Sequence, residues 1–195
     1  MSTVDTRELL IKVARKLFAQ EGIGNITMAD IAKAANKSRR TVYTYFQSKE
    51  ELLEASIEME VKKISSTVTK VAMSDLTPDK KIIKLIFVRL QATRSIVRRN
   101  SCLHSDYIVI VEHIRKSFDA KEIALFRRII EEGKQKGLFK TESPDLAARF
   151  LHFCLKGIEM PFINGIISKN NDERFVEYFT KKVILGALEY TGKTL

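Results

Sequence analysis

Apolar residues recur along this chain at spacings of three and four, with polar breaks between the runs, which is the pattern of amphipathic helices. The first run falls within residues 5–21 and consists of Leu9, Leu10, Val13, Leu17 and Phe18. Two shorter runs follow, for which Thr27 and Ser38 are suitable N-cap residues, and Asn36 can adopt the left-handed conformation that ends a helix. The first quarter of the chain therefore predicts a helix, then two short helices joined by a tight turn.

The later runs are longer. From Lys49 the pattern continues to Val71, which gives a helix of about 35 Å that can belong to two domains. Further helices are predicted over residues 78–96, 107–118, 119–137, 144–158 and 172–190. The run at 107–111 has strand propensity, but no partner strand is visible, so we predict a helix there as well. The predicted fold class is all-α with about nine helices in total.

The third helix carries polar and aromatic side chains on its outward face. At about 100° per residue, Val42 and Phe46 fall on one side, where they can pack on the helix before, and Arg40 and Thr44 point away. Eight residues span about 12 Å of helix, which suits the width of a DNA major groove. We therefore predict a DNA-binding face that consists of Thr27, Lys37, Ser38, Arg39, Arg40, Thr41, Tyr43, Thr44, Tyr45 and Lys49.

The roles of these residues follow from their chemistry. We expect Arg40 to read a guanine edge, Thr41 and Thr44 to contact a thymine methyl group or a base edge, and the tyrosines to grip phosphates. Lys49 lies in the first turn of the next helix, where the macrodipole disfavours a cation, so we expect it to share a DNA phosphate with the helix tip. The alternative is a solvated basic helix face, which leaves two exposed phenols without a purpose.

Residues 27–52 resemble the N-terminal DNA-binding domain of the TetR family of transcriptional regulators. The residues that match the family pattern are Thr27, Ile31, Ala32, Ser38, Tyr43, Phe46, Ser48, Lys49, Glu50 and Leu52. The chain departs from that pattern at the turn, where Asn36 and Lys37 replace glycine and a small aliphatic residue, although asparagine suits the same geometry. It also has Arg40 where the family often has glycine, so base readout is expected to be specific to this protein.

The resemblance implies a ligand-responsive regulator, most often a repressor, that binds a palindromic operator as a homodimer and is released by a small-molecule effector. It implies a three-helix DNA-binding domain with a helix-turn-helix at residues 1–50, followed by a helical effector-binding and dimerisation domain at 51–195, and no cofactor. Two copies would read half-sites about 34–36 Å apart, or a multiple of that distance.

The same resemblance implies dimerisation through the last two long helices, which pair into a four-helix bundle. Both helices are apolar over wide faces and contain small residues, and such faces need a second surface to cover them. The candidate interface residues are Ala147, Leu151, Cys154, Ile158, Phe175, Phe179, Val183 and Ala187. The alternative is that these positions complete the subunit's own core.

An effector pocket is less visible in the sequence. The candidate lining residues add polarity or size to otherwise apolar faces, and they are Phe87, Leu90, His104, Tyr107, His113, Phe126, His152 and Met160. For each of them ordinary core packing is the competing interpretation. The excess of basic charge in this half of the chain slightly favours an anionic or acidic effector.

Composition adds little to this picture. The net charge of +10 and the sequence pI of about 9.6 favour an anionic partner, but basic residues are in excess both in residues 1–50 and in the rest of the chain. No stretch approaches the roughly 18 uninterrupted apolar residues of a membrane span, and the N-terminus lacks a signal-peptide core. We therefore expect a cytoplasmic protein with double-stranded DNA, and no membrane, as its partner.

Other functions receive weaker support. Cys102, His104 and His113 bring metal-capable side chains into one region, so a metal-sensing regulator is an alternative. No four-ligand zinc spacing, Gly-rich phosphate loop or Gly-x-Ser-x-Gly turn occurs, and so we predict that the protein is not an enzyme. A helical protein-interaction module with no DNA target is a second alternative, which leaves the exposed tyrosines and Lys49 unexplained. The two cysteines are too few and too far apart for a disulfide framework.

Overall fold

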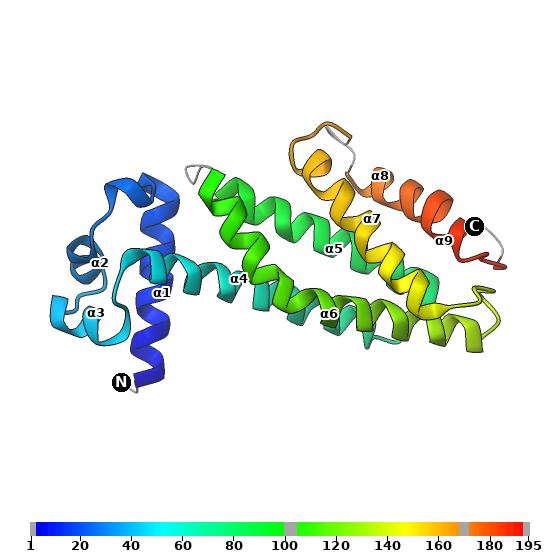
Figure 1. Cartoon of the computed structure of the whole chain (residues 1–195), viewed down its shortest axis with the longest axis horizontal. Coiled ribbons are helices and arrows are strands. Elements are labelled where there is room, and N and C mark those ends of the chain that lie inside the picture. The colour runs from blue at the N-terminus through cyan, green and yellow to red at the C-terminus, as the bar shows by residue number, and fades with distance from the viewer. Residues whose placement is uncertain (1–2, 100–104, 168–171, 193–195) are drawn as a thin grey trace. The chain divides into compact units, whose positions relative to one another are not determined.

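The structure is a computed structural model of the 195-residue chain that describes residues 3–99, 105–167 and 172–192. Within these ranges every regular element is a helix, which confirms the predicted all-α class (Figure 1). The elements are α1 (Thr3–Glu21), the 3-10 turn η1 (Ile23–Asn25), α2 (Met28–Ala34), α3 (Arg39–Tyr45), α4 (Lys49–Ala72), α5 (Pro78–Arg99), α6 (Ser105–Gln135), α7 (Pro144–Ile163), α8 (Asp172–Phe179), the π-helical turn η2 (Thr180–Ile184) and α9 (Leu185–Ala187). None of the described helices is both long and apolar enough to cross a membrane.

The helices form two compact units. The first consists of Met1–Lys63 with Ile96–Lys116, and the second of Ile64–Ser95 with Ser117–Leu195. Helices α4, α5 and α6 therefore each contribute residues to both units. Helix α4 runs through residue 50 without a break, and the predicted division of the chain at 1–50 and 51–195 stays a prediction.

One predicted helix boundary is wrong. The sequence predicted separate helices over 107–118 and 119–137, but α6 is continuous through their boundary. Neither Pro nor Gly stands nearby to interrupt the backbone hydrogen bonds. The carboxylate of Asp119 accepts a hydrogen bond from the ammonium of Lys156 on α7, at 3.1 Å.

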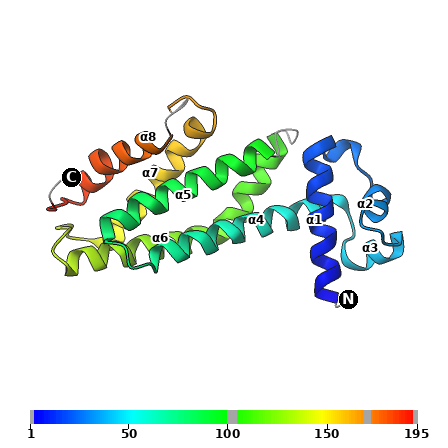
Figure 2. The ribbon, with the colours of Figure 1, turned by 180° about the vertical axis from the view of Figure 1, so that it is seen from behind.

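The first unit has its core where α1, α2 and α3 meet, and Figures 1 and 2 show these three helices gathered together from opposite sides. Of the apolar run predicted for α1, Leu10 and Phe18 are buried, whereas Leu9, Val13 and Leu17 are half-buried. The fully buried large side chains of this core include Leu10, Ile11, Phe18, Ile26, Ile31, Phe46, Leu52 and Ile57. Three helices and the start of α4 thus share one apolar centre, which fixes the orientation of α3.

The second unit has its core among the end of α4, α5, α6, α7 and the C-terminal helical segment. Its most deeply buried side chains include Ile82, Leu85, Leu90, Phe126, Ile129, Ile130, Ala148 and Phe162. Pro161 lies inside α7, which ends two residues later, at Ile163. The C-terminal helix contains the π-helical turn η2 between α8 and α9, a feature with no sequence signal that we recognised.

Candidate nucleic-acid interface

The turn between α2 and α3 is built from local hydrogen bonds. Asn36 has a φ of 51°, the left-handed conformation that asparagine tolerates better than most residues. The backbone N–H of Lys37 then donates to the carbonyl of Ala32 at 2.9 Å, which closes the end of α2. Ser38 starts α3, because its hydroxyl oxygen accepts from the N–H of Thr41 at 3.0 Å. The turn and both caps therefore form as the sequence predicted.

Thr27 has a structural role at the start of α2. Its side-chain oxygen accepts from the N–H of Asp30 at 3.2 Å, and its own N–H donates to the Asp30 carboxylate at 2.9 Å. The hydroxyl of Thr27 also donates to that carboxylate at 2.6 Å. These bonds hold the pKa of Asp30 below its ordinary value. Both the hydroxyl hydrogen and the backbone N–H of Thr27 are therefore committed to Asp30, and Thr27 has no donor of its own left for a phosphate.

Helix α3 has one buried side and one exposed side. Val42 and Phe46 are fully buried, whereas Arg39, Arg40, Tyr43 and Thr44 are exposed and Thr41 and Tyr45 are half-buried. The guanidinium of Arg40 makes no hydrogen bond or ion pair with any residue that the structure describes. The outward face is therefore the one that helical spacing predicted, and its guanidinium groups and the phenol of Tyr43 lie open to a partner.

Two hydroxyl groups on this face already have partners. The hydroxyl oxygens of Ser38 and Thr41 lie 2.9 Å apart, in a mutual hydrogen bond. The hydroxyl of Thr44 donates to the backbone carbonyl of Arg40, one turn earlier, at 2.9 Å. Of the candidate base-contacting side chains, only the Arg40 guanidinium thus has all of its donors available.

Lys49 has internal partners that the sequence did not indicate. Its ammonium donates to the carbonyl of Ile23 at 2.8 Å and to that of Ile26 at 3.3 Å. These carbonyls belong to the connection between α1 and α2, so Lys49 ties the first turn of α4 to it. Ser48 caps α4 by accepting from the N–H of Glu51 at 3.1 Å. One N–H of the ammonium is left for another acceptor.

The sequence profile described as "Bacterial regulatory proteins, tetR family" matches residues 10–56, which contain α2, α3 and the start of α4. The chain belongs to the TetR family. It is a DNA-binding transcriptional regulator of the helix-turn-helix type, and α2 and α3 are its helix-turn-helix pair.

Relatives and solved structures of the TetR fold extend the similarity beyond this domain. The chain is 25% identical to the HTH-type transcriptional regulator YhgD of Bacillus subtilis over 152 residues, which covers 75% of this chain and 78% of YhgD. It is also 25% identical over 149 residues to the HTH-type transcriptional repressor NicS of Pseudomonas putida, covering 70% and 67% of the two chains. A transcriptional regulator from Cytophaga hutchinsonii superposes with a TM-score of 0.73 at 26% identity, over 93% of this chain and 96% of that one.

The candidate dimer residues lie at different depths in the second unit. Leu151 is part of the subunit's own core, whereas Ala147, Cys154, Ile158, Phe175 and Phe179 are half-buried and Val183 and Ala187 are exposed. Burial raises the pKa of the Cys154 thiol. Leu151 exposes only 2% of its surface in the single subunit, and its place in the interface stays a prediction.

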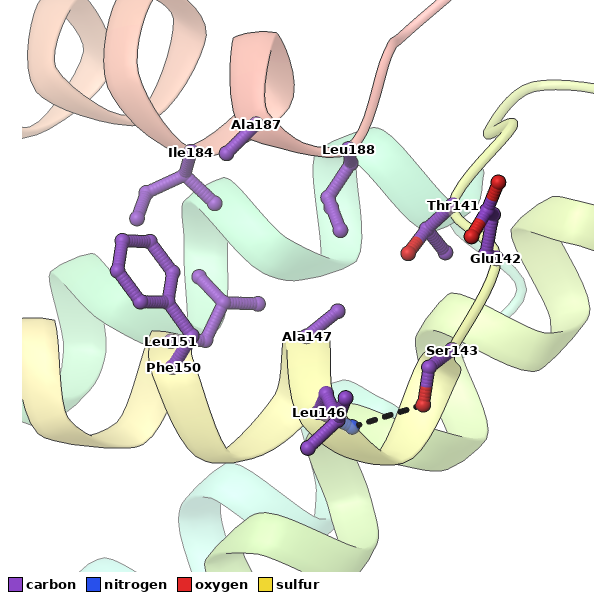
Figure 3. Close-up of a pocket in the computed structure, with 10 residues that line it drawn as sticks. All are labelled: Thr141, Glu142, Ser143, Leu146, Ala147, Phe150, Leu151, Ile184, Ala187 and Leu188. Carbon is purple, nitrogen blue, oxygen red and sulfur yellow. Dashed lines mark hydrogen bonds between the residues drawn. The ribbon is translucent and has the colours of Figure 1, made fainter.

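A different stripe of α7 is exposed. Its large apolar side chains are Leu146, Phe150, Phe153 and Met160. Next to it, α7 and the C-terminal segment enclose an open pocket of about 400 Å³ (Figure 3). In that view Phe150 and Leu151 of α7 point toward Ile184, and Leu188 projects from the C-terminal segment toward α7. Helix α7 is thus apolar on two sides, only one of which faces the core.

The candidate effector residues are also dispersed. Leu90 and Phe126 are fully buried in the core, Phe87 is half-buried, and His113 and Met160 are exposed. The side chains of His104 and Tyr107 lie outside the described residues, as does Cys102. Among the described residues no group of three or more potential metal ligands converges.

His152 belongs to a buried cluster of charged residues that the sequence analysis missed. Arg89 of α5 donates from Nε to Glu122 of α6 at 2.6 Å and from Nη1 to Glu159 of α7 at 2.7 Å. Nη1 of Arg89 also donates to the Thr93 hydroxyl at 2.9 Å. Nδ1 of His152 lies 2.7 Å from the second oxygen of Glu122. The cluster joins three helices of the second unit through their side chains.

The protonation of this cluster follows from its pairing. Burial alone would lower the pKa of Arg89, but Glu122 and Glu159 outweigh that effect and raise it above its ordinary value. Burial would raise the pKa of Glu122, and the charge of Arg89 together with the hydrogen bond from His152 instead lowers it. Arg89 and Glu122 are therefore a charged pair. Spacing gave no hint of it, because the paired residues lie on different helices.

Proposed function

We propose that this protein is a repressor that binds a near-palindromic operator as a homodimer and is released when a small-molecule effector binds. The observation that carries the proposal is the outward face of α3. It carries the guanidinium of Arg40, which has no partner among the described residues, and the adjacent exposed Arg39. The phenols of the exposed Tyr43 and the half-buried Tyr45 lie on the same helix, whose other side is fully buried. Exposed side chains of this kind add little to the stability of the fold, whereas a helix that carries them can enter the major groove of DNA and contact base edges there.

The proposed division of labour on DNA follows the chemistry of each group. Arg40 would bind the O6 and N7 atoms of a guanine, which is the commonest specific contact of arginine in the major groove. Lys37, Arg39, Tyr43 and Tyr45 would contact phosphates and set the position of α3. Thr27 and Ser38 would support DNA binding indirectly, because they cap the N-termini of α2 and α3. The remaining N–H of Lys49 would donate to a phosphate.

We propose that the second copy pairs with the exposed stripe of α7 and the adjacent surface of the C-terminal segment. Four large apolar side chains stand open along α7, and contiguous exposed apolar surface is characteristic of an interface. A two-fold pairing of helices would place each stripe against its own copy. Val183 and Ala187, both exposed, remain in this proposed interface, together with the half-buried positions named above.

We propose that the effector binds within the second unit. Helix α4 can couple effector binding to DNA binding, because it follows the helix-turn-helix directly in the chain and continues into the second unit as one helix of 24 residues. A ligand that shifts its C-terminal half would alter the position of α3 and weaken simultaneous binding to two half-sites. NicS is named as a repressor, which supports the same sign of regulation here. A protein that acts on an operator would work in the cytoplasm.

A selection of bound sequences from random double-stranded DNA tests this proposal. The expected result is enrichment of a near-palindrome with two half-sites. Failure to enrich any sequence would contradict DNA readout and favour a protein-interaction module instead.

A further inference from the structure

The side chain of Thr44 can be assigned a specific part in base recognition. We propose that Thr44 selects a thymine in each operator half-site through contact between its methyl group and the 5-methyl group of the base. This inference rests on the proposed function, because it requires α3 to enter the major groove. It goes further by naming one base and the atom group that recognises it.

The hydroxyl of Thr44 is already in use. It donates its single hydrogen to the carbonyl oxygen of Arg40, with an oxygen–oxygen distance of 2.9 Å. A hydroxyl bonded in this way cannot also donate to the acceptor atoms of guanine, adenine or thymine. The bond directs the oxygen toward the preceding turn of α3. The methyl group occupies another branch of the same β-carbon.

The position of Thr44 makes that methyl group available to DNA. Thr44 is exposed, and it lies on the side of α3 opposite the fully buried Val42. Arg40 stands one turn earlier on the same face. A thymine methyl group projects into the major groove, where a threonine methyl group is a fitting apolar contact. An exposed methyl group on this face contributes little to the fold, and a base would bury it.

Thr41 differs from Thr44 in this respect. Its hydroxyl oxygen is paired with that of Ser38 at 2.9 Å, and its side chain is half-buried at the start of α3. Thr41 therefore contributes to the N-terminal cap of the helix. From the sequence, both threonines were expected to contact a thymine methyl group or a base edge. Their hydrogen bonds show that Thr41 pairs with the N-cap residue, whereas Thr44 bonds to the backbone of the preceding turn.

The test uses the enriched operator and replaces its thymidines one at a time by deoxyuridine. This change removes only the 5-methyl group and preserves the base pair. Binding by the full-length protein is measured by fluorescence anisotropy at fixed salt. We expect one thymine in each half-site at which the replacement weakens binding about fourfold, the effect of exposing one buried methyl group.

Two variants identify the group on the protein. Thr44→Val retains a methyl group and loses the hydroxyl, whereas Thr44→Ser retains the hydroxyl and loses the methyl group. We expect Thr44→Val to keep the thymine-over-uracil preference and Thr44→Ser to lose it. The preference is a ratio measured within each variant, so a change in the folded fraction cancels.

Three outcomes overturn the inference: no thymine is sensitive in the wild type, Thr44→Ser keeps the preference, or Thr44→Val loses it. Each of these leaves the proposed function intact, because specific DNA binding has been measured. If the selection enriches no sequence, the proposed function fails and this inference fails with it.

Discussion

The guanidinium of Arg89 lies 2.7 Å from the carboxylate of Glu159, and both side chains are almost completely buried. The pair joins α5 to α7, and Glu122 joins α6 to the same arginine. Two buried carboxylates thus share one cation. We predict that Arg89→Met lowers the free energy of unfolding by about 3–5 kcal/mol, because it removes the buried cation that both carboxylates contact.

Urea unfolding monitored by circular dichroism measures this loss. The matched control is the triple variant Arg89→Met, Glu122→Gln, Glu159→Gln, which removes the buried charges together and should recover most of the stability. A loss below about 1 kcal/mol in the single variant, the range of exposed pairs, would contradict the buried pairing.

The same cluster predicts a dependence of stability on pH. The pKa of Glu122 is lower in the folded protein than its ordinary value, so the unfolded chain binds its proton more readily. Its contribution is therefore present above the unfolded pKa of about 4.3 and is lost as the pH falls through the folded pKa. We predict that Glu122→Gln flattens the acid side of the stability profile. Urea unfolding at a series of pH values measures it, with the exposed Glu54→Gln as a control that should follow the wild type.

Lys49 is predicted to have two separable effects. Lys49→Met removes the donor that the carbonyls of Ile23 and Ile26 share, and we expect the free energy of unfolding to fall by about 1–2 kcal/mol. It also removes one proposed phosphate contact, so the slope of log affinity against log salt should decrease in magnitude by about one. Unchanged thermal stability would refute the structural role, and an unchanged slope would refute the phosphate contact.

The exposed stripe of α7 predicts the oligomeric state. Phe153 is 65% exposed, so Phe153→Glu should leave the subunit folded while placing a charge in the proposed dimer interface. We expect a monomer by sedimentation equilibrium and much weaker operator binding, because the two half-sites are then bound independently. Met73→Glu changes another exposed apolar residue, which follows the end of α4 and is not part of the α7 stripe, and this variant should remain dimeric. A dimeric Phe153→Glu variant would place the interface elsewhere.

Features that depend on neighbours in sequence were predictable. The caps at Thr27 and Ser38 and the left-handed turn at Asn36 need only residues within four positions, so residue type and spacing were enough. The inward side of α3 was predictable for the same reason, because Val42 and Phe46 lie four residues apart on one short helix.

Features that depend on partners far away in the sequence could not be predicted from it. Arg89 and Glu159 are 70 residues apart, and Lys49 binds carbonyls, which every residue carries and no residue type identifies. Helix α7 shows a third reason. It is apolar on two sides, and the periodicity of its sequence cannot distinguish the side that contains Leu151 from the side that contains Phe153.

The most direct test of the account is a selection from random DNA carried out in parallel on the wild type and Arg40→Ala. The wild type should enrich a near-palindrome, and Arg40→Ala should enrich the same palindrome with one guanine position relaxed in each half-site, where the arginine contact is worth about 1–3 kcal/mol. Identical base preferences for the two proteins, or no enrichment by the wild type, would contradict the claim that the exposed face of α3 reads DNA.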